Sequence, residues 1–265
     1  SNSVFLEVYD PLTSGVLTSD QVICYSTAPA DIGFLVSPSG SAGEFDYVYQ
    51  WQVSTDMEMW ADISLATDVT LSPDALLQTT HYRVRVSSLY DCGVVFTDPM
   101  TVFLYDELLP GTVTSIDTIC YNSEPGLIST EIAPSGGDLT YTYQWFSSSN
   151  PEESWDMLPG ATLSSYQPGI LTETTYYRVD YTSGSACGTV SSNVSEVYVH
   201  TEIDPGVISS SQVICYDSLV STISMIDFPT GGGDISYTYQ WQYSLNNSSW
   251  VDIDGQTTTD YEPGY

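Results

Sequence analysis

The sequence contains no lysine, and its cationic residues are three arginines, Arg83, Arg85 and Arg178. It has 34 acidic residues, so the formal net charge is −31. A surface with so few cations repels the phosphates of nucleic acids and the headgroups of anionic lipids. We therefore expect no nucleic-acid partner and no attraction to a membrane surface.

Long apolar runs are also missing. No stretch approaches the ~20 apolar residues that a helix needs to cross a bilayer, so we expect no membrane insertion of this segment. The first residues, SNSVFL, lack the basic flank of a signal peptide. We expect any export signal or anchor to lie elsewhere in a longer protein.

What the sequence does contain is a repeat. The segments SDQVICY, SIDTICY and SSQVICY begin at residues 19, 115 and 210, and the segments YVYQWQ, YTYQWF and YTYQWQ begin at 47, 141 and 237. The cysteines of the first set lie 96 and 95 residues apart, and the tryptophans of the second set lie 94 and 96 apart. Such a register indicates tandem units with the same fold.

The repeat predicts the domain organisation. We expect the tail of a preceding repeat at 1–11, whole repeats at 12–106 and 107–203, and a truncated repeat at 204–265. The predicted linkers are short and contain proline, which restricts the backbone. We therefore expect a semi-rigid rod.

The composition favours β-structure. Tyrosine occurs 21 times, and Gly and Pro punctuate short segments in which apolar and polar residues alternate. In YTYQW, Tyr141, Tyr143 and Trp145 share one face. Short strands with turn signals about every ten residues, together with the order Cys, Trp, Cys, predict an all-β fold of tandem immunoglobulin-like β-sandwich modules of about 95 residues.

The spacing of the cysteines suggests one disulfide within each repeat. Cys24 and Cys92 are 68 residues apart, and Cys120 and Cys187 are 67 apart. We therefore predict the pairs Cys24–Cys92 and Cys120–Cys187, with the partner of Cys215 beyond residue 265. Disulfides indicate an oxidising, extracellular location. The alternative is five buried thiols in a reducing compartment.

The combination of ICY, YQWQ, WxDI, TTYYRV and the cysteine pair resembles the Ig-like or PKD-like repeats of large Bacteroidota cell-surface adhesins. These include gliding-motility adhesins of the SprB type, exported by type IX secretion. The resemblance covers essentially the whole chain, and it implies a surface filament used in adhesion or gliding. Expected partners are a surface polysaccharide or protein ligand bound through other parts of the protein, and the secretion and motility machinery.

Acidic residues are too numerous to identify a metal site by their number. One acidic position recurs in all three repeats, at Glu44, Asp138 and Asp234. These residues are weak candidates for calcium ligands, since carboxylate oxygens are the ligands that calcium prefers. The aromatic residues and cysteines recur more strictly, which favours a solvated acidic surface and no required cofactor.

A second tryptophan also recurs, at Trp60, Trp155 and Trp250. It could form an exposed platform for sugar rings, or it could cover the sheet next to the YQW segment. Its presence in every repeat favours the structural role. A carbohydrate- or protein-binding accessory module of a secreted multidomain protein nevertheless stays open as an alternative function.

Catalysis finds little support in the sequence. The histidines are His81 and His200, and the counterpart of His81 in the next repeat is Tyr176. A Ser-His or Cys-His arrangement would thus depend on a residue that the repeat does not keep. The G-x-S-x-G, P-loop and H-E-x-x-H motifs are absent, and we expect no catalytic residues and no enzymatic activity.

Overall fold

The structure, a computed structural model, describes residues 3–41, 47–89, 93–114, 117–233 and 236–263. The regular secondary structure in these ranges consists of β-strands alone, so the predicted all-β class is confirmed. None of the described residues forms a helix of the length and apolarity that a membrane span requires. Three residues named above, Glu44, Cys92 and Asp234, lie outside the described ranges.

Contacts group the chain into two compact units. The first unit holds residues 1–111, 132–143 and 180–191, and the second holds 112–131, 144–179 and 192–265. The first unit thus contains the whole first repeat together with two segments of the second.

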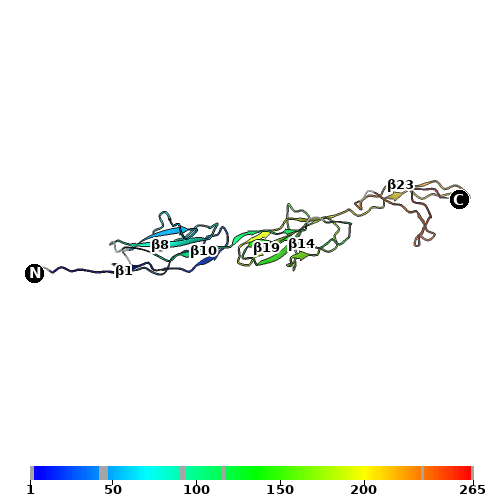
Figure 1. Cartoon of the computed structure of the whole chain (residues 1–265). Helices are drawn as coiled ribbons and strands as arrows, with labels where there is room; N and C mark the ends of the chain where they lie inside the picture. The colour runs from blue at the N-terminus through cyan, green and yellow to red at the C-terminus, as the bar shows by residue number, and fades with distance from the viewer. Residues whose placement is uncertain (1–2, 42–46, 90–92, 115–116, 234–235, 264–265) are drawn as a thin grey trace. The chain divides into compact units, whose positions relative to one another are not determined.

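The first repeat is built on a six-stranded sheet of order β3-β10-β8-β6-β7, with β9 paired to β8. β10 runs antiparallel to β8 and parallel to β3, and β8 and β10 lie side by side in Figure 1. The strands are β1 (Asp10–Thr13), β2 (Val16–Leu17), β3 (Gln21–Ile23), β4 (Phe34–Val36), β5 (Ser39–Ser41), β6 (Tyr47–Ser54), β7 (Ala61–Asp62), β8 (Thr80–Ser88), β9 (Val94–Phe96) and β10 (Met100–Leu104).

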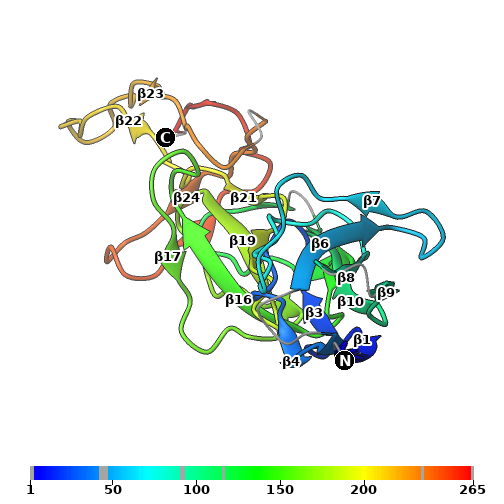
Figure 2. The same ribbon diagram turned by 90° about the vertical axis from the view of Figure 1, so that its left-hand side faces the viewer.

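The second repeat has the same sheet, in the order β13-β21-β19-β16-β17, with β20 paired to β19. Figure 2 shows β16 and β19 of this sheet next to each other. The strands are β11 (Asp106–Leu109), β12 (Thr112–Val113), β13 (Asp117–Ile119), β14 (Ile128–Ile132), β15 (Ser135–Gly137), β16 (Tyr141–Ser148), β17 (Asp156–Met157), β18 (Ser165–Tyr166), β19 (Thr175–Ser183), β20 (Thr189–Ser191) and β21 (Ser195–Val199).

The third repeat forms a three-stranded sheet, β22-β23-β26, and the hairpin β24-β25. Its sequence has no counterpart of β19, β20 or β21, because Tyr265 corresponds to Ile170 of the second repeat. The strands are β22 (Val207–Ile208), β23 (Ile223–Asp227), β24 (Gln242–Tyr243), β25 (Val251–Asp252) and β26 (Asp260–Tyr261).

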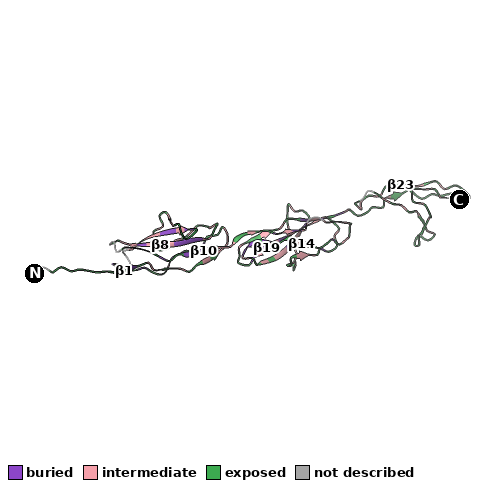
Figure 3. Ribbon diagram, in the orientation of Figure 1, coloured by how far each residue is buried: buried purple, intermediate pink, exposed green. Residues whose placement is uncertain are grey.

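The core of the first repeat lies between its large sheet and the segments that face it. Trp51, Val84 and Val102, one from each of three neighbouring strands, have no exposed surface, and they pack with Leu17 and Ile32 from the opposite layer. This two-layer packing follows from the alternation of apolar residues in β6 and β8. Figure 3 shows the buried residues concentrated on β8 and β10, whereas β23 carries exposed ones.

The YQW segment forms the same local structure in each repeat. Indole Nε1 donates to a backbone carbonyl in all three, from Trp51 to Asp68 at 2.9 Å, and with distances of 2.8 Å for Trp145 and Trp241. The preceding glutamine, Gln50 in the first repeat, donates its amide to two carbonyls across the following turn, and its counterparts do the same. These bonds satisfy polar groups that burial would otherwise leave unpaired.

Candidate functional site

The feature that distinguishes this chain from a simple series of separate domains is its disulfide. It joins Cys24 of the first repeat to Cys187 of the second, residues 163 positions apart, with a Cα–Cα distance of 5.2 Å. Both cysteines belong to the first compact unit. The bond therefore connects two repeats covalently.

This bond corrects the predicted pairs Cys24–Cys92 and Cys120–Cys187. Cys120 and Cys215 are exposed and unpaired, and Cys92 lies outside the described residues. The prediction of a disulfide, and with it an extracellular type of protein, stands. Its assignment to single repeats was wrong.

The physical reason lies in the length of one strand. Cys24 follows β3, and Ile23 at the end of β3 pairs with Leu104, whose amide lies 3.4 Å from the hydroxyl of Thr79 just before β8.

The second repeat shows the consequence. Cys120 follows β13, where Ile119 pairs with Val199, and the amide of Val199 donates to the hydroxyl of Thr174, just before β19, at 3.1 Å. Cys187 follows the far end of β19, whose nine extended residues span ~27–30 Å at about 3.3 Å per residue. Disulfide formation requires Cα atoms within ~7 Å of each other, so Cys120 and Cys187 are too far apart.

The linker after β10 brings the two repeats together at the disulfide. β11 pairs with β15 of the second repeat, with Asp106 opposite Gly137 and Leu109 opposite Ser135. A hollow of about 340 Å³ is lined by the turn after Cys24, by β11 and by the hairpin that carries Cys187. The linker is thus a strand of the second repeat's own structure.

Asp138 holds the turn next to Cys187. Its carboxylate accepts hydrogen bonds from the hydroxyls of Ser185 at 2.7 Å, Thr140 at 2.8 Å and Ser183 at 3.0 Å, and from the amide of Gly184 at 3.2 Å. The Ser185 hydroxyl, followed by that of Thr140, holds the pKa of this carboxyl well below its usual range. The recurring acidic residue is, in this repeat, a support for the loop that presents Cys187.

Calcium binding stays a prediction. Nowhere in the described residues do three His, Cys, Asp or Glu side chains group in a way that could hold a metal ion. The oxygens of Asp138 are occupied by donors from the protein. Its counterparts Glu44 and Asp234 are not described.

The second tryptophan packs on an arginine. The guanidinium of Arg83 lies 4.3 Å from the ring centre of Trp60 and 4.4 Å from that of Phe96. In the second repeat the guanidinium of Arg178 lies 4.6 Å from the ring centre of Trp155 and 5.4 Å from that of Phe146. These cation–π contacts use indole faces that a sugar platform would need.

The sequence interpretation missed these arginines, although a signal was present. Two of the three cations of this acidic chain occupy the same position, in TTHYRV and TTYYRV. A rare residue type that recurs at one position indicates a specific contact. The favoured structural role of Trp60 and Trp155 agrees with this arrangement.

His81 has a structural environment. It is buried, and its Nδ1 lies 2.9 Å from the hydroxyl of Thr101, the residue opposite it on β10. In the second repeat Tyr176 and Glu196 occupy the same pair of positions, with the phenol donating to the carboxylate at 3.4 Å. The two positions therefore change together as a cross-strand pair.

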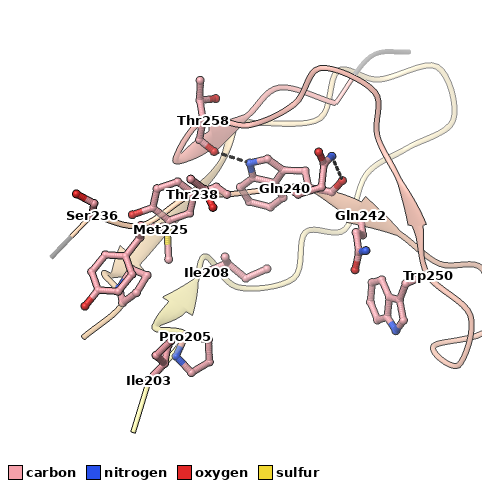
Figure 4. Close-up of a pocket in the computed structure, with 14 residues that line it drawn as sticks. Ile203, Pro205, Ile208, Met225, Ser236, Thr238, Gln240, Gln242, Trp250 and Thr258 are labelled. Atoms are coloured by element: carbon pink, nitrogen blue, oxygen red, sulfur yellow. Dashed lines mark hydrogen bonds between the residues drawn. The ribbon is translucent and has the colours of Figure 1, made fainter. Parts of the chain in front are cut away.

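The third repeat presents an open apolar hollow of about 750 Å³ (Figure 4). Ile208, Met225 and Trp241 line it, together with Trp250 at its edge. In the first repeat the corresponding inner face is covered by β8 and β10, which supply Val84 and Val102 to the core. The hollow is the inner face of a sandwich layer.

The chain is similar to several tandem-domain proteins of known structure, each at low identity. No curated protein matches the sequence. Among solved structures, the three N-terminal domains of the highly immunogenic outer capsid protein (Hoc) of bacteriophage RB49 match with 14% identity, a TM-score of 0.36, and coverage of 87% of this chain and 76% of theirs.

Two further matches are also series of consecutive domains. Immunoglobulin domains 1–5 of Sidekick-1 show 10% identity and a TM-score of 0.34, with 93% of this chain and 50% of that chain covered. Domains A168–A170 of titin show 14% identity and a TM-score of 0.40, with 71% and 66% covered. At identities of 10–14% and TM-scores of 0.34–0.40, these matches carry no conclusion about the function of this chain.

A family profile matches the chain three times in succession, at residues 13–105, 109–201 and 204–265. The three segments leave only short stretches of the chain unmatched. The chain belongs to the family described as "Domain of unknown function (DUF8696)" and carries three copies of its immunoglobulin-like repeat.

Proposed function

We propose that this chain is a structural and adhesive repeat segment of a long extracellular surface protein, a bacterial adhesin used in surface attachment or gliding motility. The observation that carries the proposal is the disulfide between Cys24 and Cys187, which connects one repeat to the next. A covalent bond across a junction limits bending and separation of neighbouring repeats. A protein that projects a binding region away from a cell needs this property.

The charge supports the same proposal. A net charge of −31 on 265 residues makes neighbouring copies repel each other at short range, within about 8 Å at physiological salt. Crowded surface filaments would thereby stay separate. The adhesive ligand, a surface polysaccharide or protein, would bind elsewhere in the protein, and the secretion and motility machinery would handle the whole chain.

The scaffold role makes this segment non-enzymatic and without a required cofactor. Its polar groups next to the junction, such as Asp138, are bonded to the protein itself. The histidine His81 pairs with the neighbouring strand. The arginine-covered faces of Trp60 and Trp155 argue against the alternative of a carbohydrate-binding module.

Small-angle X-ray scattering of the oxidised chain tests the scaffold role. We expect an elongated particle whose cross-section matches one β-sandwich, and a broader distribution of dimensions after reduction of Cys24–Cys187. A compact particle in both states would contradict the proposal.

Two further measurements address location and ligand. Antibodies against the folded chain should label intact cells of the source organism, whereas labelling only after lysis would exclude a surface role. A glycan array probed with this segment should give no binding. Strong binding that Trp250→Ala abolishes would favour the accessory-module alternative.

A further inference from the structure

We propose that the Cys24–Cys187 bond is one member of a series, in which the cysteine after the first strand of the large sheet in each repeat bonds to the hairpin cysteine of the following repeat. Cys120 is then the site of the next cross-link, and Cys215 the site of the one after it. The proposal concerns the chemistry of the junctions and goes beyond the adhesive role. It holds or fails whether or not the protein is an adhesin.

The first support is that the same backbone turn follows Cys24, Cys120 and Cys215. The residue two positions after each has a left-handed backbone, with φ of 59° at Ser26, 57° at Asn122 and 64° at Asp217. Non-glycine residues rarely adopt this conformation. The turn that directs Cys24 toward its partner is thus repeated after Cys120 and Cys215.

The hydrogen bonds of these turns also agree. The amide of Ser26 donates to the carbonyl of Leu76 at 2.8 Å, and the amide of Asn122 donates to that of Leu171 at 2.9 Å. In the third repeat the amide of Ser218 donates to the carbonyl of Cys215 at 3.2 Å, as Thr27 does to Cys24.

The second support is the path of the linker. The amide of Tyr105, at the end of the first repeat, donates to the carbonyl of Ile23 at 2.9 Å, directly before Cys24. The amide of His200, at the end of the second repeat, donates to the carbonyl of Ile119 at 2.9 Å, directly before Cys120. Each linker therefore departs from the same point beside its cysteine.

The linkers then enter the next repeat in the same register. Leu109 lies opposite Ser135, and Asp204, 95 positions later, lies opposite Thr230, 95 positions after Ser135. The amide of Gly232 donates to the carbonyl of Thr201 at 2.8 Å, which corresponds to the pairing of Gly137 with Asp106.

Two glycines permit this close approach of the linker to the next repeat. Any side chain at Gly136 would collide with the carbonyl oxygen of Glu107, and any side chain at Gly231 would collide with that of Glu202. Both glycines have positive φ, of 76° and 83°. The linker and the repeat that follows it therefore fit together by the same contact at the first and the second junction.

The exposure of Cys120 and Cys215 agrees with cysteines whose disulfide partners are not part of this chain. Cys24 and Cys187 are partly buried where they are joined, whereas Cys120 and Cys215 are exposed. The counterpart of Cys187 for the third repeat would lie after the position of Tyr265, since Tyr265 corresponds to Ile170. In the proposed series Cys120 would pair with that hairpin cysteine of a full-length third repeat.

The chemistry is thiol–disulfide exchange with an oxidised dithiol. The thiolate of one cysteine attacks the disulfide of the oxidant and releases one of its sulfurs as a thiol. The second cysteine then attacks the mixed disulfide, which forms the bond between repeats and releases the other thiol. Two protons and two electrons pass from the cysteine pair to the oxidant.

A chain with a completed third repeat tests the proposal. Residues 171–203 are copied after Tyr265, which supplies a counterpart of Cys187, and the protein is refolded with glutathione and glutathione disulfide. Unpaired thiols are then alkylated and the disulfide-linked peptides identified by mass spectrometry. We expect the copied cysteine to be bonded to Cys120, with Cys24–Cys187 intact. A bond between the copied cysteine and Cys215 would overturn the proposal, as would an alkylated Cys120.

The control carries serine in place of the copied cysteine. In it Cys120 should be alkylated completely. A second variant, Cys187→Ser in the unextended chain, does not depend on folding of the added segment. It should make Cys24 reactive and leave the labelling of Cys120 unchanged. A gain in labelling at Cys120 would show pairing within the repeat and would overturn the proposal.

Discussion

The second and third repeats share a local structure and differ in what covers it. In both, the indole of the YQW segment donates to a carbonyl at 2.8 Å. The backbone amide of the same tryptophan donates to a carbonyl of the following turn, from Trp145 to Ala161 at 3.0 Å and from Trp241 to Gln256 at 2.9 Å. Yet Trp145 is fully buried, and Trp241 lines an open hollow. The difference is that the third repeat in this sequence has no counterpart of β19 and β21.

The comparison separates two contributions to the fold. Hydrogen bonds within the YQW segment and its turn are local, and they form in all three repeats. Burial depends on strands that come 30 or more residues later in the sequence, such as β19 (Thr175–Ser183). The local hydrogen bonds therefore orient the tryptophan side chain, and the later strands cover it and make it part of the hydrophobic core.

The largest effect should come from the core tryptophans. Trp145→Ala should destabilise the second repeat by about 3–5 kcal/mol, the cost of removing a fully buried large aromatic residue. Trp241→Ala should cost clearly less, because Trp241 is already partly exposed. Denaturant titration followed by hydrogen exchange in each repeat measures both. Equal losses would show that burial does not distinguish the two sites.

A smaller difference is expected for the second tryptophan. Trp155→Ala removes a cation–π contact with Arg178 and should destabilise the second repeat by about 1 kcal/mol. Trp250 is 54% exposed, and its removal should change stability by at most about 0.5 kcal/mol. Arg178→Lys, which keeps the charge, is the matched control and should lie between wild type and Trp155→Ala. A larger loss at Trp250 would contradict the role assigned to the arginine.

Asp138 offers a local test of the junction in the second repeat. Asp138→Asn replaces an acceptor-only carboxylate by a group that also carries donors, so the amide of Gly184 should exchange faster at pH 7. Because the folded-state pKa of Asp138 is lowered, its stabilising effect is complete above its ordinary pKa near 3.9. The effect is lost as the pH falls below that value toward the lowered pKa.

Hydrogen exchange at several pH values and carbon-13 detection of the Asp138 carboxyl measure this behaviour. Asp156→Asn, at an exposed position on β17, should leave the exchange of Gly184 unchanged. A carboxyl midpoint at or above 3.9 would contradict the hydrogen-bond network.

The smallest effect is spectroscopic. Burial raises the pKa of Tyr177 to about 12, and it also raises the pKa of Tyr82. Both tyrosines lie on strands, β8 and β19, that have no counterpart in the third repeat. Their neutral forms stabilise the fold fully below pH 10, and this stabilisation is lost as the pH rises through about 12. Absorbance at 295 nm should show a late ionisation step that Tyr177→Phe reduces, and an unchanged step would contradict the burial of this phenol.

Much of the fold could be predicted because it depends on short-range patterns. The alternation in YTYQW placed Trp145 in the core, and the repeat period indicated tandem modules of one fold. The favoured role of Trp60 as a sheet-covering residue also followed from its recurrence. The arginine on which it packs required the partner strand, which sequence spacing alone does not identify.

The cysteine pairing could not be predicted from spacing, for a geometric reason. In a tandem array, a pair within one repeat and a pair shifted by one repeat recur with the same period. Only the strand order decides between them, because in the second repeat it places Cys120 beside the start of β19 and Cys187 beyond the end of that strand. In the second repeat the residue two positions before Cys187 is Ser185, whereas an ordinary immunoglobulin domain has a tyrosine there.

The most direct test of a covalent link between repeats is a disulfide map of the unmodified, oxidised chain. Free thiols are blocked, the protein is digested without reduction, and linked peptides are identified by mass spectrometry. We expect one linked pair that contains Cys24 and Cys187. Linked pairs that contain Cys24 with Cys92, or Cys120 with Cys187, would contradict the account.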